Sequence, residues 1–193
     1  MTRLDLHPPE AVACLAGRRV DPEHADKVRF PADSERMVSA ALSRTLVAER
    51  IRHLVCSAAC GADILALEAC AAADVAATIV LPFAAADFRR MSVVDRPGDW
   101  GPRFDRVLAR ARAAGTVIEL APSLRDDSAF ERANVEIVST AADMDSGRRL
   151  AVIVWDGRKV GEEDVTGHVR DLAAARGFDV VEVSTLPNVG SAS

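Results

Sequence analysis

The stretch Val55-Cys56-Ser57-Ala58-Ala59-Cys60-Gly61-Ala62-Asp63-Ile64-Leu65-Ala66-Leu67-Glu68 decides the fold of this chain. A short apolar run ends at a series of small residues, and a helix then begins at Gly61 with an apolar face. A strand, a tight turn and a helix start direct unpaired backbone N–H groups at one point, which suits a phosphate. We therefore expect a ligand at this turn. An ordinary tight turn is the open alternative, because the glycine-rich fingerprints are absent.

Composition favours one domain with a sizeable core: the chain has 193 residues, of which 49% are hydrophobic. We expect a flexible leader over residues 1–10, a single domain over 11–186 and a disordered tail over 187–193. Acidic residues outnumber basic ones, 29 to 24, and only 4% of residues are aromatic. This balance disfavours nucleic acid as a partner, because single-strand binding needs a basic groove with stacking rings.

The chain carries no recognisable targeting or membrane signal. No stretch approaches the roughly 18 apolar residues of a membrane span, and the first ten residues do not resemble a signal peptide. We expect a cytoplasmic protein without a membrane partner. The four histidines are scattered and the four cysteines include no CxxC pair, so no metal site and no cofactor are expected. Cys60 lies in the ligand turn and is expected to be an inert, space-filling thiol.

Strand and helix signals alternate along the chain. Strands are expected at 11–16, 54–56, 77–81, 116–120, 150–155 and 179–183. Helices are expected at 34–52, 61–74, 103–114, 128–147 and 165–176. The segment 83–102 has mixed signals and is expected to be a lid or binding loop with a helical turn at 87–90. Such alternation indicates a parallel sheet covered on both faces.

Several motifs resemble the SLOG superfamily, which includes the cytokinin-activating LOG enzymes and the DNA-processing Smf proteins. Leu15-Ala16-Gly17-Arg18-Arg19 is similar to its first turn, and Ser57–Glu68 to its second. The match is closest to a poorly characterised branch, through Leu81-Pro82-Phe83, Phe88, Arg90, Ser92, Val93, Trp100, Arg103, Phe104, Ala133-Asn134, Val154-Trp155-Asp156-Gly157 and Thr166. The resemblance covers about residues 11 to 184.

The resemblance implies a Rossmann-like three-layer α/β/α fold with a mainly parallel sheet of about six strands. It places phosphate over Gly17 and Ser57–Asp63, and a base or sugar near Trp155–Gly157. Two features depart from the family. The PGGxGTxxE run of LOG-type enzymes is lacking at 156–167, and Ser57-Ala58-Ala59 stands where glycines are expected. A homodimer is a further expectation for such a fold.

Each of the other candidate residues has two possible roles. Arg18 and Arg19 follow a strand end and would clamp phosphate, or would pair with Asp21 and Glu23 in a solvated loop. Asp63 would take part in catalysis, or would cap its helix or pin the neighbouring loop. Glu68 would point inward or face solvent, and Glu162 and Glu163 are further candidate acids. Asn134 would contact a ribose hydroxyl or a loop carbonyl, and Trp155 would stack a base or lie in the core.

Three functions remain open at this stage. The first is a module that binds or senses a nucleotide-derived small molecule. The second is an N-glycosidase or deoxyribosyltransferase-like enzyme, whose catalytic residues are unknown. The third is an interaction protein that keeps the fold with a degenerate site. The first is preferred, because the turn chemistry and the family resemblance both indicate it.

Overall fold

The computed structural model describes residues 9–120, 128–158 and 165–187. The strands are β1 (Ala11–Gly17), β2 (Ile51–Cys56), β3 (Ala76–Leu81), β4 (Val117–Glu119), β5 (Arg148–Trp155) and β6 (Asp179–Ser184). The helices are the 3₁₀ turn η1 (Ala32–Ser34), α1 (Glu35–Ala48), α2 (Ala62–Ala72), α3 (Ala85–Ser92), α4 (Trp100–Ala113), α5 (Ala129–Asp143) and α6 (Val165–Ala175).

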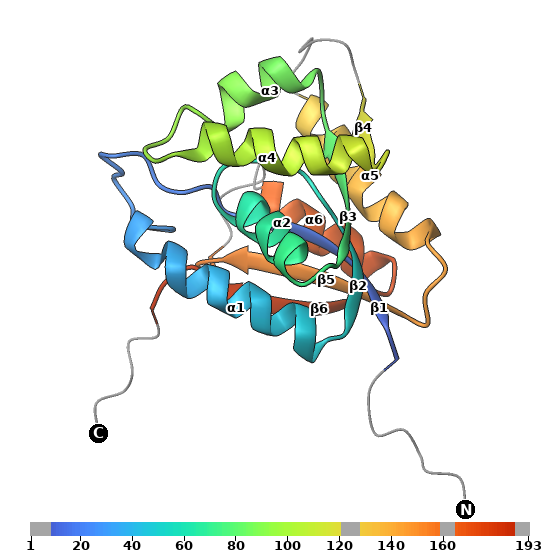
Figure 1. Ribbon diagram of the computed structural model, residues 1–193. Helices are drawn as coiled ribbons and strands as arrows, with labels where there is room; N and C mark the ends of the chain where they lie inside the picture. The colour runs from blue at the N-terminus through green and yellow to red at the C-terminus, as the bar shows by residue number, and fades with distance from the viewer. Residues whose placement is uncertain (1–8, 121–127, 159–164, 188–193) are drawn as a thin grey trace, which may run out of the picture.

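The six strands form one parallel sheet in the order β4-β3-β2-β1-β5-β6 (Figure 1). The chain builds outward from β1 to β4 and then returns to place β5 on the other side of β1. The strand order therefore reverses between β1 and β5, where open α/β sheets form a crevice at the carboxyl ends of the strands. The predicted α/β fold with a parallel sheet of six strands is confirmed.

Alternate side chains of the central strands enter two separate apolar layers, because successive residues of a strand point to opposite faces. Ala13 and Leu15 of β1 pack with α1, α2 and α4, whereas Val12, Cys14 and Ala16 pack with α5 and α6. Strand β5 divides in the same way between the two layers. Helices thus cover both faces of the sheet, and β1 at its centre is buried from Ala11 to Ala16.

Two boundaries differ from the sequence-based prediction. The helix expected to reach Arg52 ends at Ala48, and Ile51 and Arg52 belong to β2. Arg50 turns the chain with a φ of +51°, and its carbonyl accepts a hydrogen bond from the Ala11 amide. Sheet pairing of β2 with β1 therefore overrides a helical pattern that continues through these residues.

The segment expected to be a lid or binding loop contains more helix than its sequence indicates. Helix α3 spans two full turns, and α4 begins at Trp100 instead of Arg103. Pro102 lies in the first turn of α4, where backbone N–H groups have no acceptor within the helix. Its lack of an N–H group therefore costs the helix no hydrogen bond. The Trp100 indole donates to the Pro97 carbonyl at 2.9 Å and closes the turn that precedes the helix. Residues 83–84 and 93–99 are the parts of this segment that remain as loops.

The remaining elements match their predicted bounds to within a few residues, with β5 beginning two residues earlier and α5 ending four residues earlier than expected. Most of the predicted leader and tail, residues 121–127 and the candidate acids Glu162 and Glu163 lie outside the described residues. Within the described ranges, no helix combines the length and apolar character needed to cross a membrane.

Helices α1, α2 and α4 meet at the guanidinium of Arg103, which is 8% exposed. Its Nε and Nη2 donate to the two carboxylate oxygens of Glu68 at 2.9 and 2.6 Å, and its Nη1 donates to Glu35 at 2.5 Å. The same group lies 4.3 Å from the centre of the Trp100 ring. All three nitrogens of this arginine therefore donate to carboxylates, and these interactions offset the desolvation penalty of a buried cation.

We expect Arg103→Met to lower the free energy of unfolding by about 2 kcal/mol, because two partly exposed carboxylates lose their shared cation. Urea unfolding measures the change. Arg112→Met is the matched control, since Arg112 is 55% exposed and pairs with Glu119 on the surface. Its effect is expected to be below about 0.5 kcal/mol. Equal losses in both variants would contradict a special role for Arg103.

Candidate functional site

A cavity of about 810 Å³ opens at the carboxyl ends of β1, β2 and β3. Part of its lining is charged or polar: Arg18, Arg19, Asp21, Asp26, Lys27, Arg29, Ser57, Asp63, Ser92, Arg96, Asn134 and Thr166. The rest is made of small and apolar residues: Leu15, Ala16, Gly17, Val20, Pro22, Ala25, Ala59, Pro82, Phe88, Met91, Phe130, Ala133, Ile137 and Val165. The cavity adjoins the point where the strand order reverses.

The back of the cavity is a very close contact between the end of β1 and the start of α2. A Cβ atom on Gly17 would lie 2.3 Å from Ala62 Cβ and 2.8 Å from Val154 Cβ, so no larger residue fits there. Gly61 has a φ of +99°, and its own Cβ would lie 2.8 Å from the Arg18 carbonyl oxygen. The Ala62 amide donates to that carbonyl at 3.2 Å. Both glycines therefore serve close packing of the two turns.

Three backbone amides of the Ser57–Asp63 turn, where phosphate was expected to bind, already donate hydrogen bonds to protein groups. The Ala59 amide donates to Asp63 Oδ2 at 3.1 Å, and the Cys60 amide to the Ser92 carbonyl at 3.0 Å. The Ala62 amide donates to Arg18, as described above. The expectation that this turn points its N–H groups freely at a ligand is thus wrong for these three amides, because neighbouring loops take up the donors. The turn therefore offers fewer amides to an anion than its sequence predicts.

Asp63 pins the turn that precedes its own helix, which was one of the two structural roles expected for it. Its side chain is buried and lines the cavity. Burial raises the pKa of this carboxyl from 3.8 to about 7, although the Ala59 amide and the nearby Arg19 act in the opposite direction. Asp63 is therefore a proton-exchanging group near neutral pH at the surface of the cavity.

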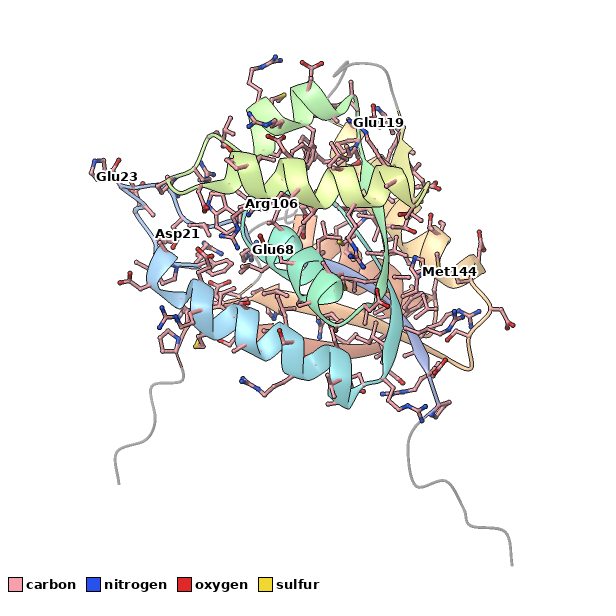
Figure 2. All side chains as sticks on the ribbon, viewed as in Figure 1. Asp21, Glu23, Glu68, Arg106, Glu119 and Met144 are labelled. Atoms are coloured by element: carbon pink, nitrogen blue, oxygen red, sulfur yellow. The ribbon has the colours of Figure 1, made fainter. Side chains whose placement is uncertain are left out.

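The two arginines after β1 have separate partners. Arg18 Nε lies 3.4 Å from Asp156 Oδ1, and its Nη2 donates to the Arg158 carbonyl at 2.7 Å. Arg19 Nη2 donates to Asp95. Asp21, expected as their partner, instead accepts the backbone amides of Arg29 and Phe30 at 2.8 and 2.9 Å and so shapes the loop between β1 and α1. Asp21 and Glu23 both lie on this loop (Figure 2).

Unpaired polar atoms concentrate at this cavity. Among the described residues, six buried side-chain nitrogen or oxygen atoms have no hydrogen-bond partner. Four of them belong to residues that line the cavity: Arg19 Nε, Arg29 Nη1, Arg96 Nε and Ser57 Oγ. Buried polar groups without partners are uncommon, and a cluster of them at one cavity is typical of a binding site. Arg148 Nη1 and Trp155 Nε1 are the other two.

Half of the predicted site residues line the cavity: Gly17, Arg18, Arg19, Ser57, Ala59, Asp63, Asn134 and Thr166. Asn134 Nδ2 donates to the carbonyl of Val165 at 3.3 Å, so its partner is the first residue of α6 and not a loop carbonyl as expected. Ala58, Cys60, Gly61, Ala62, Arg90, Trp155, Asp156 and Gly157 do not line it. Burial raises the pKa of the Cys60 thiol, even though Arg19 beside it lowers it, as expected of an inert cysteine.

The other predicted residues take part in separate interactions. Arg90 is 70% exposed and pairs with Asp87 at 2.8 Å. Trp155 is 8% exposed and packs in the apolar layer under α5 and α6, as expected of a core residue. Glu68 points toward α4, where it binds Arg103 and lies 3.9 Å from Arg106 (Figure 2). Neither Arg90 nor Glu68 therefore reaches the cavity.

Sequence reasoning missed Lys27, Arg29 and Arg96. The first two lie in a charged connector with no periodic pattern, and the Asp21 side chain brings this connector to the cavity. Arg96 lies in the segment expected to be a binding loop, but no motif distinguishes it from its neighbours. A buried aromatic residue inside the polar connector, Phe30, is the one signal that this segment packs against the domain.

Within the described residues, no group of three or more His, Cys, Asp or Glu side chains is arranged to hold a metal ion. No protein family matches this chain, and no curated protein is similar enough to match it. The resemblance to the SLOG superfamily therefore stays a prediction. The residues of the cavity are the basis on which a function can be argued.

We expect Asp63→Asn to stabilise the protein above about pH 7. The folded chain raises the pKa of Asp63 from 3.8 to about 7, so the folded state binds a proton more tightly than the unfolded state. The wild type therefore loses stability as the pH rises from about 4 to 7, by up to ~4 kcal/mol. The asparagine carries no charge and retains an acceptor for the Ala59 amide.

Thermal unfolding of both proteins between pH 4 and 8 measures this effect. The melting temperatures are expected to be similar near pH 4 and to diverge toward pH 7 in favour of the variant. A variant that is less stable than the wild type at pH 8 would contradict the argument. It would show that the ionised carboxylate stabilises the fold through Arg19.

Proposed function

We propose that this protein binds a nucleotide-derived small molecule in the cavity at the ends of β1, β2 and β3. One observation carries the proposal: Arg19 Nε, Arg96 Nε and Ser57 Oγ are buried at this cavity without hydrogen-bond partners, and Arg29 Nη1 has only the ion pair with Asp156 Oδ2 at 3.6 Å. Guanidinium N–H groups and a serine hydroxyl are the donors that phosphate oxygens accept from. A bound phosphate would satisfy donors that otherwise keep a desolvation cost.

The charge of the cavity supports an anionic ligand. Its lining includes five basic residues and three acidic ones, although the whole chain has a net charge of −5. Asp63 carries less negative charge near neutral pH than an ordinary aspartate, because its pKa is about 7. Asp21 is occupied by two backbone amides. Basic residues therefore outnumber acidic ones in the lining itself, although Asp95 and Asp156 pair with its arginines from outside it.

Other residues of the lining suit the rest of such a ligand. Phe130, Ile137 and Met91 are apolar, and Asn134 and Thr166 are polar. Phe130 is held in place by an edge-on contact with Phe83, with ring centres 5.7 Å apart. An apolar wall with a few polar groups is the usual surface for a flat heterocycle. A volume of about 810 Å³ is sufficient for a ligand of nucleotide size.

The expected result with the purified protein is thermal stabilisation by at least one of AMP, ADP, ADP-ribose, NAD and a cyclic dinucleotide. Mass action gives ~2.7 kcal/mol of stabilisation at a hundredfold excess over the dissociation constant. Arg19→Ala and Arg96→Ala should each weaken binding by about 10- to 100-fold, because each removes a charge-assisted hydrogen bond. Calorimetric titration measures the dissociation constants.

Arg112→Ala is the matched control, because Arg112 forms an ion pair on the surface and does not line the cavity. The Arg112→Ala variant is expected to bind the nucleotides with the same affinity as the wild type. If none of these compounds stabilises the protein, nucleotide binding is ruled out as the function of this cavity. The interaction-protein alternative would then be preferred.

A second candidate function is cleavage or transfer at an N-glycosidic bond. It is favoured by the position of Asp63, a cavity-lining carboxyl whose pKa of about 7 suits a general acid or base. Incubation with nucleoside monophosphates should then release free base, detected by chromatography. Asp63→Asn should reduce the rate by about 100-fold or more. Wild-type protein that binds a nucleotide without releasing base would leave binding as the function.

A further inference from the structure

Three residues from separate segments of the chain each place an unpaired polar atom at the cavity. The atoms are Arg19 Nε, Arg96 Nε and Ser57 Oγ, which are buried without hydrogen-bond partners. Arg19 follows β1, Ser57 follows β2, and Arg96 lies on the loop between α3 and α4. We refer to these three residues as the donor cluster. What holds its two arginines in place decides how well the cluster can bind a ligand.

A single carboxylate connects the two arginines of the donor cluster. Arg19 Nη2 donates to Asp95 Oδ1, and Arg96 Nη1 lies 3.4 Å from Asp95 Oδ2. Asp95 itself does not line the cavity, and its side chain is 33% exposed. The carboxylate therefore binds both guanidinium groups by their terminal nitrogens, from outside the cavity.

Other arginine–carboxylate pairs of this protein use a different edge of the guanidinium. Arg103 donates through Nε and Nη2 to the two oxygens of Glu68. Arg89 donates through the same two nitrogens to Asp105, at 2.9 and 3.1 Å. Such a two-pronged pair occupies the Nε–H group of the arginine, so that this group is no longer available to a ligand.

The contacts of Asp95 leave the Nε–H groups of Arg19 and Arg96 unused. Both Nε atoms are buried without a hydrogen-bond partner. The Cys60 thiol lies beside Arg19, but burial raises its pKa, and a neutral thiol is only a weak acceptor. A carboxylate that merely neutralised these arginines would be expected at the Nε edge. Asp95 instead fixes the two side chains and leaves one donor of each for another acceptor.

The loop that carries Asp95 is itself anchored on both sides. The Ser92 carbonyl, at the end of α3, accepts the Cys60 amide at 3.0 Å. On the other side, the Trp100 indole donates to the Pro97 carbonyl at 2.9 Å. Asp95 lies between these two anchors, so its carboxylate has a defined position from which to orient the arginines.

We propose that Asp95 is a positioning residue for a phosphate group, which binds in the cavity to Arg19 Nε, Arg96 Nε and Ser57 Oγ. The inference rests on the proposed function and adds to its site a residue that lies outside the cavity. The ligand class is a molecule with a terminal phosphate. Such a phosphate has three acceptor oxygens, which matches the number of donors in the cluster.

Loss of the Asp95 charge should change affinity in the direction opposite to simple electrostatics. Removal of a carboxylate makes the surroundings of the cavity more positive, which by itself favours an anion. Without Asp95, however, both guanidinium groups gain rotamer freedom, and binding must then order them again. We therefore expect Asp95→Asn to weaken phosphate binding by about tenfold, whereas charge alone predicts tighter binding.

Calorimetric titration of the full chain with inorganic pyrophosphate and with AMP tests this role. Asp99→Asn is the matched control, because Asp99 lies on the same loop, is 75% exposed and pairs with Arg103 at 3.7 Å instead of with a cavity arginine. Asp95→Asn should weaken both probes about tenfold, and Asp99→Asn should leave both affinities within about twofold. Asp95→Glu keeps the charge and should recover part of the lost affinity.

The positioning role is overturned if Asp95→Asn binds both probes as tightly as the wild type or more tightly. It is also overturned if Asp95→Glu binds no better than Asp95→Asn, or if Asp99→Asn loses as much affinity. Nucleotide binding survives each of these results as long as the wild type binds AMP. Conversely, pyrophosphate binding that depends on Asp95, without any binding of AMP, supports the role of Asp95 and counts against a nucleotide. If neither probe binds the wild type, both proposals fail.

Discussion

The close contact between the end of β1 and the start of α2 is the constraint on which the rest of the structure depends. Gly17 and Ala62 approach so closely that a single methyl group on Gly17 would overlap the helix. The hydrogen bond from the Ala62 amide to the Arg18 carbonyl then holds the two turns in register. Because the backbone of β1 is fixed here, the side chains of Arg18 and Arg19 leave it at set positions beside the cavity.

This constraint limits what the backbone of the turn can offer to an anion. A helix start usually offers free amides to an anion. In this protein three of the turn amides bind protein groups, and arginine side chains from the loops before α1 and α4 supply donors instead. Close backbone packing therefore occurs at the turn, whereas the positively charged side chains of the cavity come from other parts of the chain. The acidic net charge of the protein does not describe this local site.

The fold could be predicted largely from local patterns, and the errors have clear physical causes. Apolar runs such as the one in β5 are buried on both faces, so they identify central strands without knowledge of their neighbours. The end of α1 was misplaced because Ile51 and Arg52 fit a helical pattern, and only pairing with β1 makes them a strand. Ser57, Asp63 and Asn134 were identified because each lies at a strand end or interrupts an apolar face. Arg29 and Arg96 carry no such local signal.

The sequence by itself determined the alternation of strands and helices, the parallel sheet and the turn at which the cavity forms. These features follow from residue periodicity and from small residues at a strand-to-helix turn, which act over a few neighbouring positions. Only the tertiary structure decided which amides remain for a ligand and which arginines share an aspartate. Those outcomes depend on contacts between residues 19 and 95, or 18, 29 and 156, which are far apart in the chain. Hydrogen bonds and ion pairs act over a few ångströms in space, so their partners are set by how the loops meet at the ends of the strands.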